Sequence, residues 1–377
     1  MKIETIALPA ASPGTSRQID FLHFGTPGQG HKAYLQAALH ADEIPGLLVL
    51  HKLIGLLDEA EKQGRISGHI VLVPVANPIG IAQHILGELA GRYDLSNGIN
   101  FNREHIELTE RIAERVGKYL NDNKDANTRL IREAALSILA NNAPLDEAAA
   151  LKHALAMNAI DADIALDLHC DWQSVMHIYT GTPIWPEARD LAAYLGAEVS
   201  LLAEVSGGNP FDEALSGLWW ALAKRFPDYP IDNACMAATI ELRGKADVEE
   251  SLAEQDALAL FHYLQSNGII SGVAPEPPAL QNPATPLDGV EKIVAPIAGV
   301  VSYNKQPGDR VMPGDVVCTL FDVSDYDAGK ARIELTASVE GILYSRRMDR
   351  LARPGQVLGR IAGKESLPDA GAHLLTD

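Results

Sequence analysis

The sequence predicts an α/β protein with a mixed, largely parallel, twisted sheet that carries helices on both faces, followed by a small all-β, barrel-like domain. Three observations support this prediction. Short apolar β-type runs alternate with amphipathic segments as far as about residue 270, a proline-rich stretch follows, and two similar β-rich halves come next. In such a sheet the working loops lie at the carboxyl ends of the strands.

The α/β domain is expected to cover residues 1–270, with strands at DFLHF, KAYLQAAL, HIVLVPV, DIALDLH, SVMHIYT, AEVSLLAE and MAATIELR. The segment PGLLVLHKLIGLLDEAEKQG repeats its apolar residues every three to four positions and ends near Gly64, as a helix does. Residues 104–160, rich in Ala, Leu, Glu and Arg, predict two or three inserted helices. These helices would pack on the rest of the domain, form a contact surface in a homo-oligomer, or cover the site as a lid.

The second domain is expected at residues 290–365, after a proline-rich linker at 271–289 and before a tail at 366–377. Its first half, APIAGVVSYNKQPGDRVMPGDVVCTL, is echoed by ASVEGILYSRRMDRLARPGQVLGRI. The pair resembles the biotinyl and lipoyl carrier domains. Lys330 lies between the halves, but its neighbours differ from those of a modified lysine, so we interpret the domain as structural and expect it to roof the site.

Composition excludes several classes of function. The 377 residues are 47% hydrophobic and 21% charged, as in globular proteins, and the formal net charge of −19 argues against nucleic acid or anionic membrane as a partner. No apolar run is long enough to span a bilayer and the first residues do not resemble a signal peptide, so we expect a cytoplasmic protein. The three cysteines form no CxxC pair, which argues against a disulfide framework or a thiolate zinc site.

A candidate metal site begins where an apolar run stops at His40, three residues before Glu43. An imidazole and a carboxylate at a strand-to-helix junction suit Zn²⁺. The run DIALDLHCD supplies a third ligand, His169, and strand alternation places Asp167 on the same face, where it could orient that imidazole. Two histidines and one glutamate leave the fourth position open for water, as in catalytic zinc sites. Alternatively, each histidine is an ordinary hydrogen-bonded loop residue.

Two further segments carry candidate residues. Glu241 lies inside the apolar run MAATIELRG, where burial of an unpaired carboxylate would be costly, so it should face a polar cavity and could act as a general base. The alternative is a structural salt bridge with Arg243. In NGINFNR, Asn102 and Arg103 could grip a substrate carboxylate in bidentate fashion, or form a surface turn.

These motifs, in this order, resemble the succinylglutamate desuccinylase and aspartoacylase family of the zinc carboxypeptidase clan. The resemblance covers about residues 30–245 and rests on His40-x-x-Glu43, the NP of residues 77–78, the NFNR of 100–103, the DLH of 167–169 and the IEL that holds Glu241. It implies a deacylase that cleaves the amide bond of a small N-acyl amino acid or related amine. It also implies one zinc ion per chain, bound by His40, Glu43 and His169.

The resemblance further implies that Glu241 is the general base and that Asn102 and Arg103 bind a substrate carboxylate. Two positions depart from the family pattern. Ala41 replaces the usual glycine after the first histidine, and Ile79 stands where aspartoacylase-like members have an arginine that polarises the scissile carbonyl. We expect Arg92 to replace that arginine.

Other functions are weighed against this one. GTPGQGHK lacks the ending of a phosphate-binding loop. A cysteine hydrolase is disfavoured, because Cys170 and His169 are adjacent in a strand and should face opposite sides. A metallocarboxypeptidase that trims peptides remains an alternative. So does a non-catalytic binding or carrier protein modified at Lys330.

Overall fold

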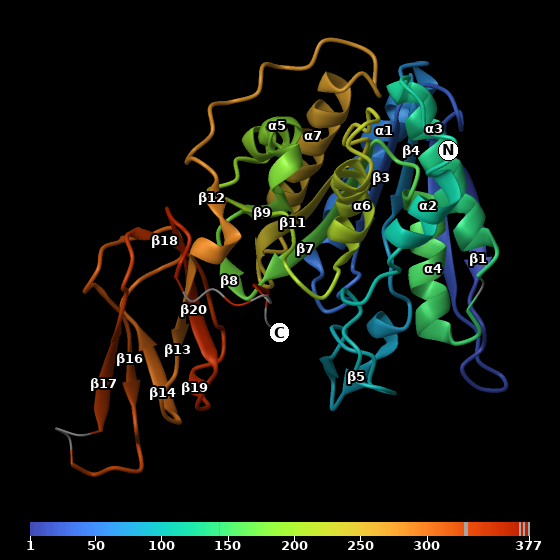
Figure 1. Cartoon of the computed structure of the whole chain (residues 1–377). Coiled ribbons are helices and arrows are strands. Elements are labelled where there is room, and N and C mark those ends of the chain that lie inside the picture. Colours follow the sequence, from blue (N-terminus) through green and yellow to red (C-terminus); the bar gives the residue numbers. More distant parts are fainter. Residues whose placement is uncertain (143, 328–330, 369–370, 372–373, 376–377) are drawn as a thin grey trace.

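The structure is a computed structural model that describes residues 1–142, 144–327, 331–368, 371 and 374–375. Its larger part is an α/β unit built on one nine-stranded sheet, and a smaller all-β part lies beside it (Figure 1). The sheet order is β1 (Lys2–Ala7), β2 (Gln18–Gly25), β4 (His69–Val73), β3 (Lys32–Ala37), β7 (Ile164–Asp171), β11 (Met236–Gly244), β9 (His177–Gly181), β10 (Val199–Ala203) and β12 (Thr285–Pro286).

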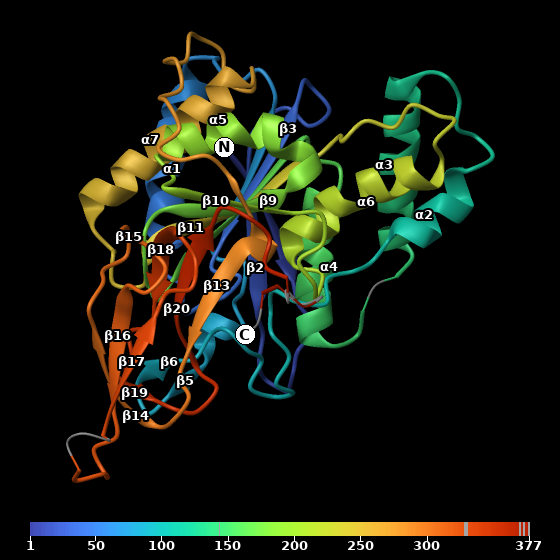
Figure 2. The same ribbon diagram turned by 60° about the vertical axis from the view of Figure 1, so that its left-hand side comes forward.

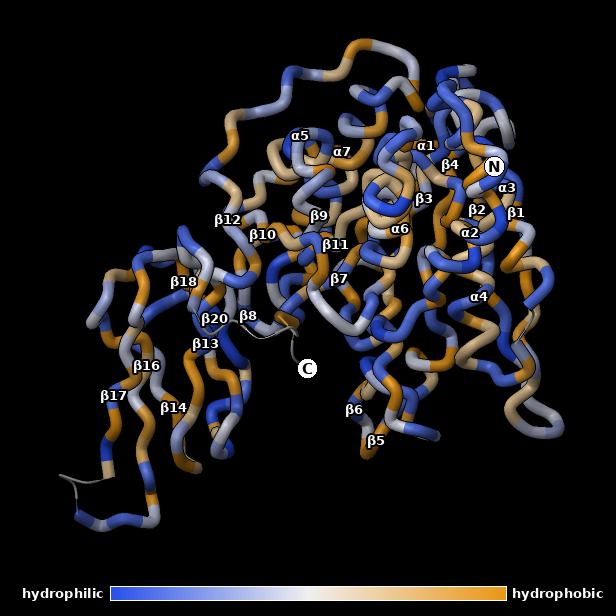
Figure 3. Tube along the Cα trace, viewed as in Figure 1, coloured by the Kyte–Doolittle hydropathy of each residue, from blue (hydrophilic) through white to orange (hydrophobic). Residues whose placement is uncertain are grey.

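The centre of this sheet is parallel. Strands β4, β3, β7 and β11 run in one direction, whereas β9, on the other side of β11, is antiparallel to it and parallel to β10. Every residue of β4 and nearly every residue of β7 is buried, which explains their unbroken apolar runs. Hydrophobic residues accordingly line the strands in the middle of the molecule (Figure 3). The predicted mixed, largely parallel sheet is confirmed.

Helices cover both faces of the sheet (Figure 2). One face packs against α1 (Pro45–Lys62), α5 (Trp185–Leu195) and α7 (Glu250–Ser266). The other packs against α2 (Thr109–Val116), α3 (Lys124–Ala140), α4 (Glu147–Ala159) and α6 (Phe211–Arg225). Within the described residues, no helix is both long and apolar enough to cross a membrane.

The stretch 104–160 holds the three helices α2, α3 and α4. Their apolar residues, such as Ile112, Ile131 and Leu155, share a buried cluster with Phe21 of the sheet. None of the described residues of this stretch lines the cavity discussed below. The three helices therefore cover the sheet.

The C-terminal part consists of two small antiparallel sheets around their own apolar core. One contains β13 (Val290–Val294), β20 (Val357–Gly363), β18 (Gly341–Arg346) and β15 (Arg310–Val311), and the other contains β17 (Arg332–Thr336), β16 (Val316–Phe321), β14 (Gly299–Tyr303) and β19 (Leu351–Ala352). Residues 271–284 carry no regular element and connect α7 to β12, at the edge of the large sheet (Figure 1). Lys330 lies outside the described residues.

The two parts are joined by backbone pairing and by a shared apolar cluster. Strand β8 (Gln173–Ser174), just after β7, pairs with β18, and the Val175 N–H donates to the Tyr344 carbonyl at 3.0 Å. Tyr179 and Leu201 of the large sheet pack with Tyr344 and other residues of the C-terminal part. The small domain thus lies directly against the strands that follow the carboxyl end of β7.

Candidate active site

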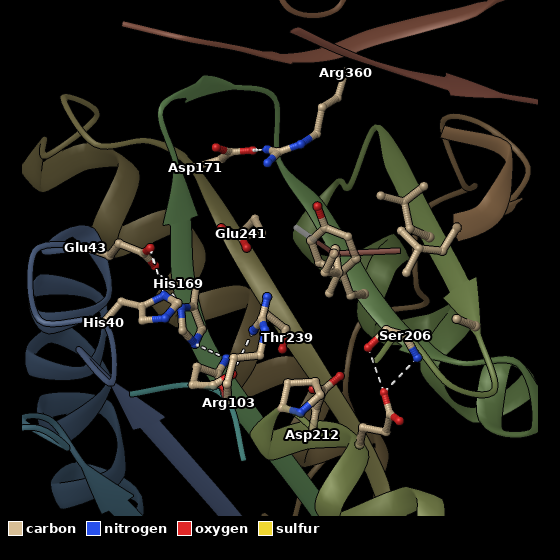
Figure 4. Close-up of a pocket in the computed structure, with 18 of the residues that line it drawn as sticks. His40, Glu43, Arg103, His169, Asp171, Ser206, Asp212, Thr239, Glu241 and Arg360 are labelled. Carbon is tan, nitrogen blue, oxygen red and sulfur yellow. Dashed lines mark hydrogen bonds and ion pairs between the residues drawn. The ribbon is translucent and has the colours of Figure 1, made fainter. Parts of the chain in front are cut away.

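The candidate site lies where β3, β7 and β11 end side by side. His40 follows β3 by three residues, His169 lies on β7 and Glu241 on β11, directly opposite His169 in the strand register. Glu43 lies just before α1, which begins at Pro45, so the β3–α1 turn brings it back toward His40. In Figure 4 the two imidazoles and the Glu43 carboxylate point toward one another, with Glu241 beside them.

His40, Glu43 and His169 form a compact group with the donor set of a metal site. Glu43 Oε1 lies 3.1 Å from His40 Nδ1, and Glu43 Oε2 lies 2.8 Å from His169 Nδ1. One ligand atom from each residue can be chosen so that all lie within 4.8 Å of one another, and all three residues are buried. Among the residues that the structure describes, no other group of histidine, cysteine or carboxylate side chains meets these criteria.

The outer nitrogen of each imidazole has its own partner. His40 Nε2 lies 2.8 Å from Asn100 Oδ1, and His169 Nε2 lies 2.8 Å from Asp167 Oδ2. An acceptor at Nε2 places the ring proton there and leaves Nδ1 with a lone pair directed at the centre of the group. Asp167 therefore lies next to the His169 ring, as expected, whereas sequence reasoning gave Asn100 no role.

The electrostatics of the group favour a cation. Burial alone would raise the pKa of Glu43, but the two adjacent imidazoles hold that pKa well below its usual value. Burial alone would lower the pKa of His169, but Asp167 and Glu43 hold it well above the usual value. A buried imidazole between two carboxylates thus retains a proton, and a divalent cation could supply that positive charge instead.

The turn after β3 accommodates the side chain of Ala41 by means of two glycines. A Cβ atom on Gly91 would lie 2.7 Å from the Ala41 Cβ, and one on Gly80 would lie 2.9 Å from it. The Ala41 N–H donates to the Gly91 carbonyl at 3.0 Å, and the Asn77 amide donates to the Leu39 carbonyl at 2.8 Å. The loop that contains the NP motif is therefore packed closely against the metal-site turn.

Because Gly91 packs against Ala41, the next residue, Arg92, lies at the site. Its Nη1 lies 2.9 Å from Glu43 Oε1 and 3.1 Å from His40 Nδ1, and its side chain is 36% exposed. Ile79, by contrast, is buried in the apolar cluster on one face of the sheet and does not line the cavity. The guanidinium group beside the metal-site residues therefore belongs to Arg92.

Glu241 faces the cavity and is not paired with Arg243. The regular pairing of β11 with β7 is interrupted between Glu241 and Gly244, and Arg243 has a φ of 61°, so the strand alternation breaks there. Arg243 Nη1 donates instead to Asp256 Oδ1 at 3.3 Å. The alternative of a Glu241–Arg243 salt bridge is wrong.

The carboxylate of Glu241 is buried close to the Glu43 carboxylate. Its Oε2 atom is buried and makes no hydrogen bond to the described residues. Burial, followed by the nearby charge of Glu43, raises the pKa of Glu241 to about 8. A bound cation would counter this effect, because an adjacent positive charge favours the carboxylate form.

Asn102 and Arg103 both line the cavity, but each also has a partner in the protein. Asn102 Oδ1 accepts from the Phe211 N–H at 2.9 Å, at the start of α6, and its Nδ2 lies 3.4 Å from His169 Nε2. Arg103 Nη1 donates to the Asn102 carbonyl at 2.7 Å. These contacts are not those of an exposed surface turn. They hold the Arg103 guanidinium over the strands, near Thr239 in Figure 4.

One cavity of about 530 Å³ is lined by all the predicted site residues, namely His40, Glu43, Arg92, Asn102, Arg103, His169 and Glu241. Cys170 borders it too, and burial raises the pKa of its thiol far above the usual range, so it is no thiolate nucleophile. Asp212, in the first turn of α6, also lines the cavity, and burial together with Glu213 raises its pKa to about 7. No sequence motif marked Asp212.

The C-terminal domain supplies part of the cavity wall, including Arg347, Arg353 and Arg360. Arg360 Nη1 donates to Asp171 Oδ2 at 2.9 Å, two residues after His169 (Figure 4). The guanidinium groups of Arg347 and Arg360 lie 4.5 and 4.7 Å from the centre of the Trp172 ring. Because Arg360 is far from β7 in the sequence, only the folded chain reveals this contact.

The strand ends of this α/β sheet thus carry a buried His-Glu-His group, which has the donor set of a metal site, and a glutamate beside it, an arrangement that suits a hydrolase. The chain belongs to the succinylglutamate desuccinylase/aspartoacylase family, whose catalytic-domain profile matches residues 29–266. The enzymes after which this family is named hydrolyse the amide bond of acyl amino acids.

Solved structures agree with this assignment. A protein of the same family from Shewanella amazonensis SB2B is 26% identical, with a TM-score of 0.83 over 97% of this chain and 99% of that one. A protein described as a succinylglutamate desuccinylase/aspartoacylase from Shewanella frigidimarina NCIMB 400 is 22% identical, with a TM-score of 0.86 over 96% and 97% of the two chains. The product-bound ectoine utilization protein EutE (DoeB) from Ruegeria pomeroyi is 17% identical, with a TM-score of 0.68 over 96% and 95%.

A search of the curated proteins found none that matches this chain. The alignments include almost the whole length of this chain and of the Shewanella and Ruegeria proteins. Those proteins therefore also contain a counterpart of the C-terminal domain.

Proposed function

We propose that this protein is a zinc-dependent hydrolase that cleaves the amide bond of a small N-acyl amino acid or a related N-acyl amine. One observation carries the proposal. The buried group of His40, Glu43 and His169 shares a cavity with Glu241, whose carboxylate has no hydrogen-bonding partner at Oε2 among the described residues. A metal site adjacent to a free carboxylate is the arrangement that hydrolysis by an activated water requires.

The donor set fits zinc. Two imidazole nitrogens and one carboxylate oxygen are ligands that zinc prefers, and a set of three leaves a coordination position open, as in catalytic sites. We infer one zinc ion per chain, held by His40 Nδ1, His169 Nδ1 and a Glu43 oxygen. When bound, zinc would polarise a carbonyl group and lower the pKa of water toward about 7.

Glu241 would serve as the general base. It would accept the proton of the attacking water and then deliver it to the nitrogen of the leaving amine. Its position opposite His169 in the strand register keeps it beside the metal ligands without making it one of them. Since Arg243 is paired with Asp256, its guanidinium group does not compensate the Glu241 carboxylate, which is then available for proton transfer.

Two arginines, Arg92 and Arg103, would interact with the substrate. Arg92, held next to Glu43 and His40, would polarise the scissile carbonyl in place of the arginine that Ile79 replaces. Arg103, with Asn102, would bind a substrate carboxylate. Arg103 lines the cavity, and the donation of its Nη1 to the Asn102 carbonyl fixes the position of the guanidinium group there.

The C-terminal domain would act as a wall of the site. Its arginines line the cavity, and its strands pair with the segment that directly follows β7. Its resemblance to biotinyl and lipoyl domains remains a prediction, and so does the alternative of a carrier modified at Lys330.

The test is metal analysis of the purified protein, followed by a screen of N-acetyl, N-formyl and N-succinyl amino acids and diamines. We expect about one zinc per chain and release of a free amine from at least one compound. Cleavage of C-terminal dipeptides without any deacylation would favour the metallocarboxypeptidase. Absence of zinc together with a biotin or lipoyl adduct on Lys330 would favour the carrier.

Arg103→Ala is expected to reduce kcat/KM for a carboxylate-bearing substrate by about ten- to a hundredfold, because one charge-assisted contact contributes roughly 1.5 to 3 kcal/mol. Arg103→Lys keeps the charge but loses the planar fork and should recover only part of this loss. Arg189→Ala, at an exposed arginine of α5, is the matched control and should have no effect. An equal loss on a substrate whose carboxylate is amidated would contradict this role.

A further inference from the structure

The cavity extends well beyond the candidate reacting centre. The strand register places Thr239 of β11, Tyr179 of β9 and Leu201 of β10 in one row across the sheet. Glu241 lies on one side of this row. On the other side lie Gly181 and Ala203, which are direct neighbours across β9 and β10 and are two residues, or about 7 Å, farther along their strands. All of these residues line the cavity.

This far end of the cavity, formed by Tyr179, Gly181, Leu201, Ala203 and Trp220, has small residues between large apolar ones, and we call it the distal recess. Because alternate residues share a face of a strand, Tyr179 and Gly181 face the cavity together, as do Leu201 and Ala203. The Trp220 ring lies against Gly181, so that a Cβ atom there would come within 2.7 Å of it. The Trp220 ring thus occupies the place that a side chain at position 181 would take, and both residues border the cavity.

The polar groups near the distal recess are already satisfied. Glu213 accepts hydrogen bonds from the Ser206 N–H at 2.9 Å and from the Ser206 hydroxyl at 2.7 Å. Thr180 Oγ1 donates to the Ala237 carbonyl at 2.8 Å. Asp212 is buried, and its raised pKa of about 7 favours the neutral acid more than an ordinary aspartate would. The five residues of the distal recess contribute apolar surface to a cavity whose other walls carry polar and charged side chains.

We propose that the distal recess is a specificity subsite that binds an apolar group of the substrate, at the end remote from the scissile amide. The inference rests on the proposed function and adds to it a substrate class: an N-acyl amino acid or amine with an aliphatic or aromatic group. That group can belong to the acyl chain or to the amine, and the two sources can be separated by experiment.

Two series of hydrolysis products measure the subsite without requiring turnover. Binding to the zinc-loaded protein is followed by calorimetry for acetate, butyrate, hexanoate and octanoate, and for glycine, leucine and phenylalanine. If the acyl chain carries the apolar group, affinity should rise from acetate to octanoate by about fourfold per added methylene until the recess is filled, the value expected for a buried CH₂ group. If the amine carries it, affinity should instead rise from glycine to leucine and phenylalanine. The series that shows the rise identifies the part of the substrate that carries the apolar group.

Ala203→Phe fills the recess from the end of β10, outside the proposed catalytic residues. It should abolish the rise with chain length and leave the binding of the shortest ligand unchanged. Ala10→Phe, at an exposed alanine between β1 and β2, is the matched control and should preserve the rise. Thermal unfolding of both variants establishes that each is folded, and Ala203→Leu provides a smaller filler if the larger ring prevents folding.

The outcomes separate this inference from the proposed function. A flat affinity across both series, or a rise that Ala203→Phe and Ala203→Leu leave intact in folded protein, overturns the subsite. Affinity that rises with chain length in a protein that hydrolyses none of the N-acyl compounds supports the apolar site and contradicts the deacylase. Hydrolysis confined to short, polar substrates, with flat binding series, supports the deacylase alone.

Discussion

Glu241→Gln is expected to lower turnover of the N-acyl substrate by a factor of about 10² to 10⁴, which corresponds to roughly 3 to 5 kcal/mol of activation free energy. Glutamine keeps the size and hydrogen-bonding capacity of the side chain but cannot accept the proton of the attacking water. Zinc content should not change, because Glu241 is not among the ligand residues. The measurements are steady-state kinetics and metal analysis of the same preparation.

The melting temperature of this variant distinguishes catalysis from structure. Burial raises the pKa of Glu241 to about 8, so in the metal-free protein its ionised form is disfavoured and a neutral glutamine should not destabilise the fold. Asp256→Asn, which removes the buried partner of Arg243, should lower the melting temperature instead. Glu276→Gln, in the exposed linker, is the silent control. Normal turnover by a less stable Glu241→Gln protein would assign Glu241 to the fold.

The sequence predicts the positions of the site residues because two of them come at the ends of apolar runs and a third interrupts such a run. His40 and His169 each come at the end of a buried strand, and parallel neighbouring strands bring their carboxyl ends together. Glu241 stood out because an ionisable residue inside an apolar strand needs a special environment. These arguments use local pattern and one general property of parallel sheets, so they need no knowledge of long-range packing.

Other features depend on contacts that no local pattern records. The pairing of Arg243 follows from a break in strand alternation, which is caused by its left-handed backbone conformation. The position of Arg92 depends on how a loop packs against Ala41, and the glycines that permit this packing occur 39 and 50 residues later in the sequence. Arg360 reaches Asp171 from the other domain. Each requires the tertiary structure.

His40→Ala and His169→Ala are both expected to abolish stoichiometric zinc binding and, with it, detectable hydrolysis. Each variant removes one of three protein ligands from a buried site, and the remaining imidazole and carboxylate form an incomplete set. Metal analysis after dialysis against a weak chelator gives the zinc content. His51→Ala, at an exposed histidine of α1, is the matched control and should retain one zinc per chain.

Asp167→Asn provides a graded test of the same site. Asparagine keeps the shape of the side chain beside His169 Nε2 but removes the charge that makes the imidazole a better ligand. Partners of this kind typically change metal affinity by about 10- to 100-fold, so zinc binding should weaken without disappearing. A competition titration with a chromogenic chelator measures the change. Near-normal zinc content in both histidine variants would place the metal elsewhere in the protein. In that case Asp167→Asn should also leave the zinc affinity unchanged, because Asp167 acts only through His169.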